Sequence, residues 1–209
     1  SRATATSPVS IGLGPVTLPE IYDRPQIVTR TDDNQINLAQ FERWGGDLNK
    51  DLTRTLARNL MSRLNTDSVA LFPWSGRYKP DFQVTIRFFR LDGQLDEAVT
   101  LDGVWRLLDG SRGCELAAHR FEYQEQTTGA GYPELVDAMS RGVSRLSQKI
   151  AVEVASSRPG CEQAGPGAKR NPTYQTIANE FASTRFSFME GRSGFSRDAD
   201  LNNLLRDSV

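Results

Sequence analysis

Two patterns of hydrophobic and polar residues assign much of the chain to helices and strands. Leucines recur every four positions from Leu48 to Leu64, with Met61 beside them, which predicts an amphipathic helix over residues 48–64 with Asp47 as its N-cap. A second apolar stripe predicts a helix over residues 133–155. The stripe comprises Leu135, Met139, Val143, Leu146, Ile150 and Val154.

Between the two predicted helices, apolar and polar residues alternate with a period of two. This alternation predicts strands over residues 82–91 and 99–107, with Asp92-Gly93 as the hairpin turn between them. Asp109-Gly110 is expected to turn the chain into a third strand over residues 114–124. The sequence therefore predicts an α+β, two-layer domain, in which a mainly antiparallel sheet is packed by two amphipathic helices.

The opening segment is rich in proline, which fixes φ and favours extended backbone at the residue before it. We interpret it as a strand, a kink and a second strand at a sheet edge, where proline is tolerated. If Tyr22 and Arg24 face solvent there, this segment is a candidate docking surface, since Tyr and Arg are enriched in interface hot spots. The candidate interface residues are Pro19, Tyr22, Arg24, Pro25, Gln26, Trp44 and Trp74.

The three tryptophans have different expected roles. Trp105 falls in the apolar register of its strand and is expected in the core. Trp44 and Trp74 either cap the ends of the sheet or form a rim for subunit or lipid-headgroup contact, because Trp suits places that are apolar on one side and wet on the other.

Composition excludes some classes of function. The chain has 209 residues, 38% hydrophobic and 24% charged, which is typical of a globular protein. Its 25 basic residues are balanced by 26 acidic ones, so there is no general positive field for nucleic acid. No apolar run approaches the ~20 residues of a membrane-spanning helix.

Residues suited to catalysis or metal binding are few. His119 is the single histidine, and we expect it to be a surface or partly buried strand residue. Two distant cysteines and one histidine lack the spacing of zinc ligands, and Gly12-Leu13-Gly14-Pro15 is not a phosphate-binding loop. Cys114 and Cys161 leave two alternatives, a disulfide that pins the end of the second helix to the sheet or two free thiols. No cofactor is expected.

The predicted organisation has three parts: a flexible tether over residues 1–10, a folded domain over 11–156, and a linker with a mobile tail over 157–209. Pro, Gly and small polar residues mark the linker. Short helices are expected near residues 174–181 and 199–205. Two roles stay open for the tail, a solvated end or a segment that orders on a partner.

Several short motifs, in order, resemble the PqiC-type ABC-transport auxiliary lipoproteins. The most specific is the run from Gly14-Pro15-Val16-Thr17-Leu18-Pro19 to Val28-Thr29-Arg30. It is followed by Phe41 and Trp44, three residues apart, and then by Leu71–Trp74, Val104–Asp109 and Ala138–Arg141. The resemblance covers roughly residues 9–155.

This resemblance implies a fold similar to the N-terminal domain of TolB-type proteins. It also implies a non-enzymatic subunit of an MCE-type intermembrane phospholipid transport system, which contributes to envelope integrity. Implied partners are an MCE-domain protein that spans the periplasm, its inner-membrane permease and further copies of the chain, with a ring as one possible arrangement of those copies. The implied location is the periplasmic face of the outer membrane, through an N-terminal lipid on a Cys that precedes these residues.

Three questions stay open at this stage. One is whether a further strand precedes the first residue given. Another is whether the protein is instead a monomeric periplasmic carrier with an apolar, lipid-binding cavity. An enzyme is a third reading, and it would need a clustered nucleophile and base.

Overall fold

The computed structural model describes residues 9–31, 35–75 and 77–161. Most of the predicted tether, residues 1–8, and most of the predicted tail, residues 162–209, lie outside the described residues. The short helices expected near residues 174–181 and 199–205 lie there too.

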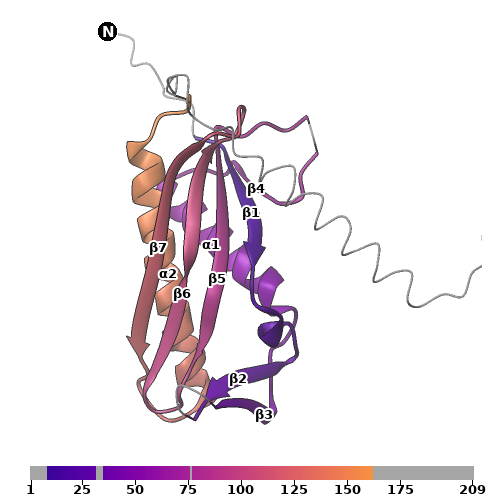
Figure 1. The fold of residues 1–209 in the computed structure, drawn as a ribbon, viewed down its shortest axis with the longest axis vertical. Helices are drawn as coiled ribbons and strands as arrows, with labels where there is room; N and C mark the ends of the chain where they lie inside the picture. The colour runs from indigo at the N-terminus through magenta and orange to yellow at the C-terminus, as the bar shows by residue number, and fades with distance from the viewer. Residues whose placement is uncertain (1–8, 32–34, 76, 162–209) are drawn as a thin grey trace, which may run out of the picture. The chain divides into compact units, whose positions relative to one another are not determined.

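A five-stranded sheet forms one layer of the domain (Figure 1). In spatial order its strands are β4 (Val69–Leu71), β1 (Ile11–Thr17), β5 (Phe82–Gly93), β6 (Ala98–Asp109) and β7 (Glu115–Gln126). β5, β6 and β7 form the predicted antiparallel meander, whereas β1 runs parallel to both β4 and β5. The prediction of an α+β domain with a mainly antiparallel sheet is confirmed.

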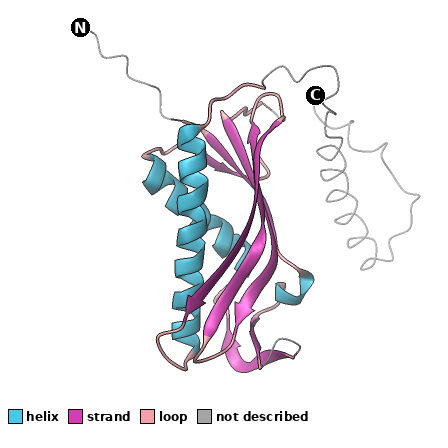
Figure 2. Cartoon of the chain, turned by 60° about the vertical axis from the view of Figure 1, so that its left-hand side comes forward, coloured by secondary structure: helices cyan, strands magenta, loops and turns pink. Residues whose placement is uncertain are grey.

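Two helices form the second layer, α1 (Leu48–Leu64) and α2 (Tyr132–Ser156), and both lie against the same face of the sheet (Figure 2). α1 packs on β1 and β4, and α2 packs on β5, β6 and β7. The predicted stripes face the core, since Leu52, Leu56 and Leu60 are buried in α1. All six predicted stripe residues of α2 are buried as well.

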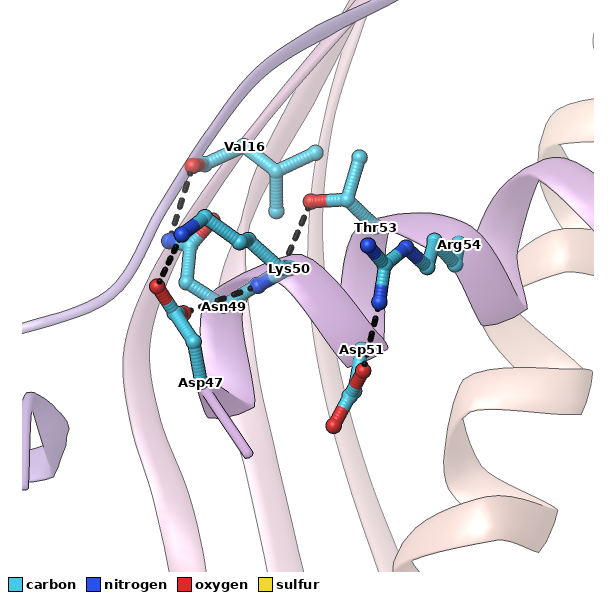
Figure 3. A network of polar contacts seen from close by, with 7 residues as sticks. All are labelled: Val16, Asp47, Asn49, Lys50, Asp51, Thr53 and Arg54. Carbon is cyan, nitrogen blue, oxygen red and sulfur yellow. Dashed lines mark hydrogen bonds and ion pairs between the residues drawn. The ribbon is translucent and has the colours of Figure 1, made fainter. Parts of the chain in front are cut away.

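The first turn of α1 is fixed by side-chain contacts (Figure 3). Asp47 is the N-cap, as predicted, because its carboxylate accepts a hydrogen bond from the Lys50 backbone N–H at 3.0 Å. That bond is the main reason why the pKa of Asp47 lies below its usual value. Asn49 donates its side-chain amide to the Val16 carbonyl at 3.1 Å, which ties the start of α1 to the end of β1.

The predicted position of the β5–β6 turn is wrong. Asp92 and Gly93 are the last paired residues of β5, opposite Thr100 and Val99, and the chain turns at residues 94–97. Asp96 there has φ of 64°. Gly93 allows a close approach, since a Cβ on it would lie 2.4 Å from the Ala98 carbonyl oxygen. The Asp-Gly pair therefore serves strand contact rather than the turn.

The edge position predicted for the opening segment is also wrong for its first strand. β1 lies between β4 and β5, where proline normally removes a ladder hydrogen bond. Pro15 is accommodated because the pairing with β5 shifts register between Leu13 and Val16. The side-chain amide of Gln83 donates to the Gly14 carbonyl at 2.8 Å, so that this irregular backbone has a buried partner.

The second part of the opening segment forms a separate two-stranded sheet, β2 (Gln26–Arg30) with β3 (Ile36–Arg43). A 3-10 turn, η1 (Glu20–Tyr22), connects β1 to it. In Figure 1 this small sheet, which we call the β2–β3 ribbon, lies at the end of the main sheet where β5 turns into β6.

The folded part extends slightly beyond the predicted limits of 11 and 156. The Ser10 hydroxyl and backbone N–H both donate to the Asp81 carboxylate, at 2.7 and 2.8 Å. At the other end, Cys161 forms a disulfide with Cys114, at a Cα–Cα distance of 6.0 Å. The bridge fixes residues 157–161 beside the β6–β7 turn.

Candidate partner-binding surface

Tyr22 is not a solvent-facing anchor, contrary to the sequence interpretation. Its side chain is only 3% exposed, and its hydroxyl donates a 2.8 Å hydrogen bond to the Asp92 carboxylate. Burial, with a further contribution from the Asp92 charge, raises the pKa of Tyr22 to about 12. Tyr22 therefore fixes η1 to the main sheet instead of contacting a partner.

The Asp92 carboxylate accepts hydrogen bonds from three segments of the chain. It is fully buried, and its two oxygens accept from Tyr22, from Arg30 of β2 at 2.8 Å and from Arg90 of β5 at 2.7 Å. Burial alone would lower the pKa of Arg30, but the hydrogen bond and charge of Asp92 outweigh it and raise that pKa. This cluster, which we call the Asp92 cluster, holds the β2–β3 ribbon against the end of β5.

The ribbon carries an apolar surface on its edge strand. Ile36 and Leu38 of β3 are 43% and 41% exposed, and Phe41 is 79% exposed, the largest exposure among the large hydrophobic residues described as exposed. Among the described residues β3 pairs with β2 on one side only, so its other edge can receive a further strand. Exposed apolar groups on an unpaired edge are typical of a protein–protein contact.

Sequence reasoning had assigned no site role to these three residues. Phe41 has a role in the sequence analysis only as the first residue of the family motif that ends at Trp44. The short alternation Ile36-Asn37-Leu38 is a weak strand signal that could have located β3.

Most of the other proposed interface residues lie near the ribbon. Pro25 is exposed, whereas Pro19, Arg24, Gln26 and Trp44 are half-buried. Trp44 packs against the core and donates its backbone N–H to the Pro25 carbonyl at 2.8 Å. The Nε atom of Arg24 is buried and has no hydrogen-bond partner among the described residues. These residues form a rim between β2 and the start of α1.

Trp74 does not belong to this surface. It lies in the β4–β5 connection, and its ring would be 2.6 Å from a Cβ on Gly12, near the start of β1. β1 starts at the end of the main sheet opposite the ribbon (Figure 1). Trp105, by contrast, is 3% exposed and in the core, as predicted.

The described residues provide little for metal or acid–base chemistry. Within residues 9–31, 35–75 and 77–161, no group of three or more His, Cys, Asp or Glu side chains could hold a metal ion. His119 is an exposed strand residue, as predicted, and it stacks on Trp105 and lies 3.3 Å from the Glu153 carboxylate. No helix in the described part of the chain is long and apolar enough to cross a membrane.

An open groove of about 460 Å³ lies between α1 and β4. Met61, Val69 and Leu71 give it apolar walls, and Arg54 and Arg58 line it as well. Arg54 is paired with Asp51 at 3.2 Å. The groove is open to solvent at the edge of the sheet, where α1 lies over β4.

Solved structures show the same fold. An uncharacterised protein of known crystal structure is 23% identical, with a TM-score of 0.61 over 69% of this chain and 92% of its own. The protein XCC0632 from Xanthomonas campestris, of the family DUF330, is 15% identical, with a TM-score of 0.59 over 70% of this chain and 83% of its own. No curated relative matches the chain.

A family model establishes the membership that the motifs suggested. The model of the ABC-type transport auxiliary lipoprotein component matches residues 1–151, which include every described strand and most of α2. The chain therefore belongs to the family of ABC-type transport auxiliary lipoproteins, the PqiC-type family that its opening motif resembles.

Proposed function

We propose that the protein is a non-enzymatic periplasmic subunit of an MCE-type intermembrane phospholipid transport system and contributes to envelope integrity. The observation that carries the proposal is family membership over residues 1–151. In this proposal an N-terminal lipid holds the subunit at the outer membrane. Its partners are a periplasm-spanning MCE-domain protein, the inner-membrane permease and further copies of itself in a ring.

The β2–β3 ribbon is the proposed contact for the MCE-domain protein. Its exposed apolar residues, Ile36, Leu38 and Phe41, lie on a strand with a free edge, a geometry that an extended segment of a partner can use. Pro19, Arg24, Pro25, Gln26 and Trp44 would form the rim of the contact. Phe41 would be its anchor, and truncating such an anchor commonly costs ~2 kcal/mol or more in binding.

The test is co-purification of the partner with the lipidated, full-length protein expressed in its own host. Phe41→Asp is expected to lose the MCE-domain protein from the purified complex, because it places a charge in an apolar contact. Val152→Asp is the matched control, since Val152 is an exposed apolar residue (56%) on α2.

Equal melting temperatures of both variants would show that the fold is intact. Retention of the partner by Phe41→Asp would reject the ribbon as the contact. Failure of wild-type protein to retain any MCE-domain protein would reject the transport role itself.

A lipid carrier is the second candidate, and the groove between α1 and β4 is the observation that favours it. A single acyl chain could lie on Met61, Val69 and Leu71, with its headgroup near Arg58. The carrier predicts a monomer that retains one phospholipid through gentle extraction. Loss of the bound phospholipid from the Met61→Asp variant would assign the lipid to this groove.

A further inference from the structure

The chain enters the domain at the end that is opposite the β2–β3 ribbon. The Ser10 hydroxyl donates a hydrogen bond to the Asp81 carboxylate, immediately before β5. Ile11 pairs with Val69 of β4 and Phe82 of β5. The β6–β7 turn lies at the same end, because the Gly110 backbone N–H donates to the Asp81 carbonyl at 3.0 Å. We call this the entry end of the domain.

An aromatic cluster lies at the entry end, in the β4–β5 connection. The ring of Trp74 is 5.5 Å from that of Phe72 and 6.3 Å from that of Tyr78, with edge-on geometry in both pairs. Phe72 is 42% exposed. Apolar surface is therefore displayed together with Trp and Tyr, the residue types that are enriched where proteins meet the lipid–water interface.

Glycines in β1 allow this cluster to rest directly on the sheet. Ile11 and Leu13 are buried against the helices, so Gly12 between them faces the other side of the sheet. A Cβ on Gly12 would lie 2.6 Å from the Trp74 ring, and one on Gly14 would lie 2.7 Å from Cβ of Phe72. The cluster is thus a fixed part of the fold.

Basic side chains accompany the aromatic cluster. Arg77 and Lys79 are exposed in the same connection, and Arg112 is exposed in the neighbouring β6–β7 turn. Arg158 is exposed just before Cys161, which the disulfide holds beside that turn. Acidic residues lie here too. Asp67 and Glu115 are exposed, and Glu115 is paired with Arg106 at 3.4 Å. Asp81 is hydrogen-bonded to Ser10, and the buried Asp109 accepts hydrogen bonds from the backbone N–H groups of Ser111 and Arg112.

The opposite end carries exposed charges of both signs, and Arg43 of β3 is among the basic ones. Asp96 and Glu97 are exposed in the β5–β6 turn, and Asp137 is exposed in the second turn of α2. The exposed Arg77, Lys79 and Arg112 give the entry end positive groups that can contact an anionic surface.

We propose that the entry end is a membrane-contacting surface that binds a bilayer of anionic phospholipid. Phe72 and Trp74 would lie at the lipid–water interface, and Arg77, Lys79 and Arg112 would contact phosphate groups. The surface goes beyond the proposed transport role, because it needs no protein partner. It would orient the domain with the β2–β3 ribbon pointing away from the membrane.

The probe is the oxidised, non-lipidated chain with vesicles of phosphatidylcholine, either alone or mixed with phosphatidylglycerol, separated by flotation. Binding is expected with phosphatidylglycerol and is expected to weaken as salt is added. Arg77→Glu with Lys79→Glu is expected to weaken binding by roughly tenfold or more, since each basic residue near such a surface contributes measurably. Phe72→Ser is expected to weaken it through the lost apolar contact.

Matched variants away from the entry end are Arg43→Glu, which changes an exposed Arg of β3, and Phe89→Ser, which changes an exposed Phe in the half of β5 nearer the ribbon. Both should bind vesicles as wild type does. Absence of vesicle binding by the wild-type chain, or equal losses from the two ends, would overturn the proposal. Neither result would affect co-purification of the MCE-domain protein, so the two proposals can fail separately.

Discussion

The hydroxyl of Tyr22 donates a 2.8 Å hydrogen bond to the Asp92 carboxylate across 70 residues of sequence. The bond joins the most specific motif of the family to the last residues of β5. With Arg30 and Arg90 on the same carboxylate, it determines where the β2–β3 ribbon lies. A motif that resembles a docking segment thus contains at least one residue whose role is internal.

Removing the Asp92 carboxylate should destabilise the domain strongly. Asp92→Ala leaves two arginines and a tyrosine hydroxyl without their acceptor, and breaking a buried ion pair in this way costs about 3–5 kcal/mol. Tyr22→Phe removes one neutral donor and should cost about 1–2 kcal/mol. Denaturant unfolding measures both changes.

Asp51→Ala is the control for the Asp92 variant, because it removes an exposed ion pair with Arg54. Such surface pairs contribute at most about 1 kcal/mol. If Asp92→Ala costs no more than Asp51→Ala, the Asp92 cluster does not hold the ribbon.

Tyr22 should make stability fall in alkaline solution. Its pKa is about 12 in the folded protein against an ordinary value of 10.0, so the folded state holds the phenolic proton more tightly than the unfolded state. The resulting stabilisation, roughly 2–3 kcal/mol, is fully present below pH 10 and is lost as the pH rises towards 12. The difference in unfolding free energy between wild type and Tyr22→Phe isolates this effect from other titrating groups. A difference that stays constant from pH 8 to about pH 11.5 would contradict the assignment.

The bridge between Cys114 and Cys161 should be detectable by mass and by stability. Reduction should add about 2 Da, because it breaks one S–S bond and adds two hydrogens. The disulfide closes a loop with a sequence separation of 47. Its loss should therefore lower the free energy of unfolding by roughly 3–4 kcal/mol on the loop-entropy estimate. A variant with both cysteines changed to serine should not respond to reductant. Equal responses of wild type and this variant would show that the thiols are not bridged.

Gly12→Ala should displace the aromatic cluster at the entry end. The new Cβ would lie 2.6 and 2.9 Å from two ring atoms of Trp74 and 3.0 Å from Pro80, so the ring must move. Overpacking of this kind costs about 1–3 kcal/mol. Trp74 should become more accessible to acrylamide quenching, measured in a Trp44→Phe background in which Trp105 stays buried. Gly45→Ala, with nothing within 4 Å of its Cβ, is the control and should change neither quantity.

The helices could be predicted from sequence because their signals are local. The leucine spacing and the Asp47 cap gave α1 its observed bounds, residues 48–64, and the α2 stripe was buried as expected. Propensity failed where a distant residue decided the structure. Asp92-Gly93 has the composition of a turn, but Tyr22 and Arg30 hold Asp92 in β5 from 70 and 62 positions away.

The candidate surfaces could be predicted only in part, because exposure depends on what the fold leaves uncovered. Ile36 and Leu38 alternate like any half-buried strand, and only the arrangement of the ribbon shows that they are exposed. Trp74 could be recognised as an interfacial residue type. Its separation from Trp44, at the other end of the domain, depends on the parallel pairing of β1 with β4 and β5, which has no local sequence signal.

Native mass spectrometry of the full-length, lipidated protein, extracted gently from its own membranes, tests the central claim most directly. It reports the lipid anchor, the number of subunits, the partners and any bound lipid in one experiment. The account predicts a multimer that retains an MCE-domain protein. A monomer that carries one phospholipid and no partner would contradict it and favour the carrier.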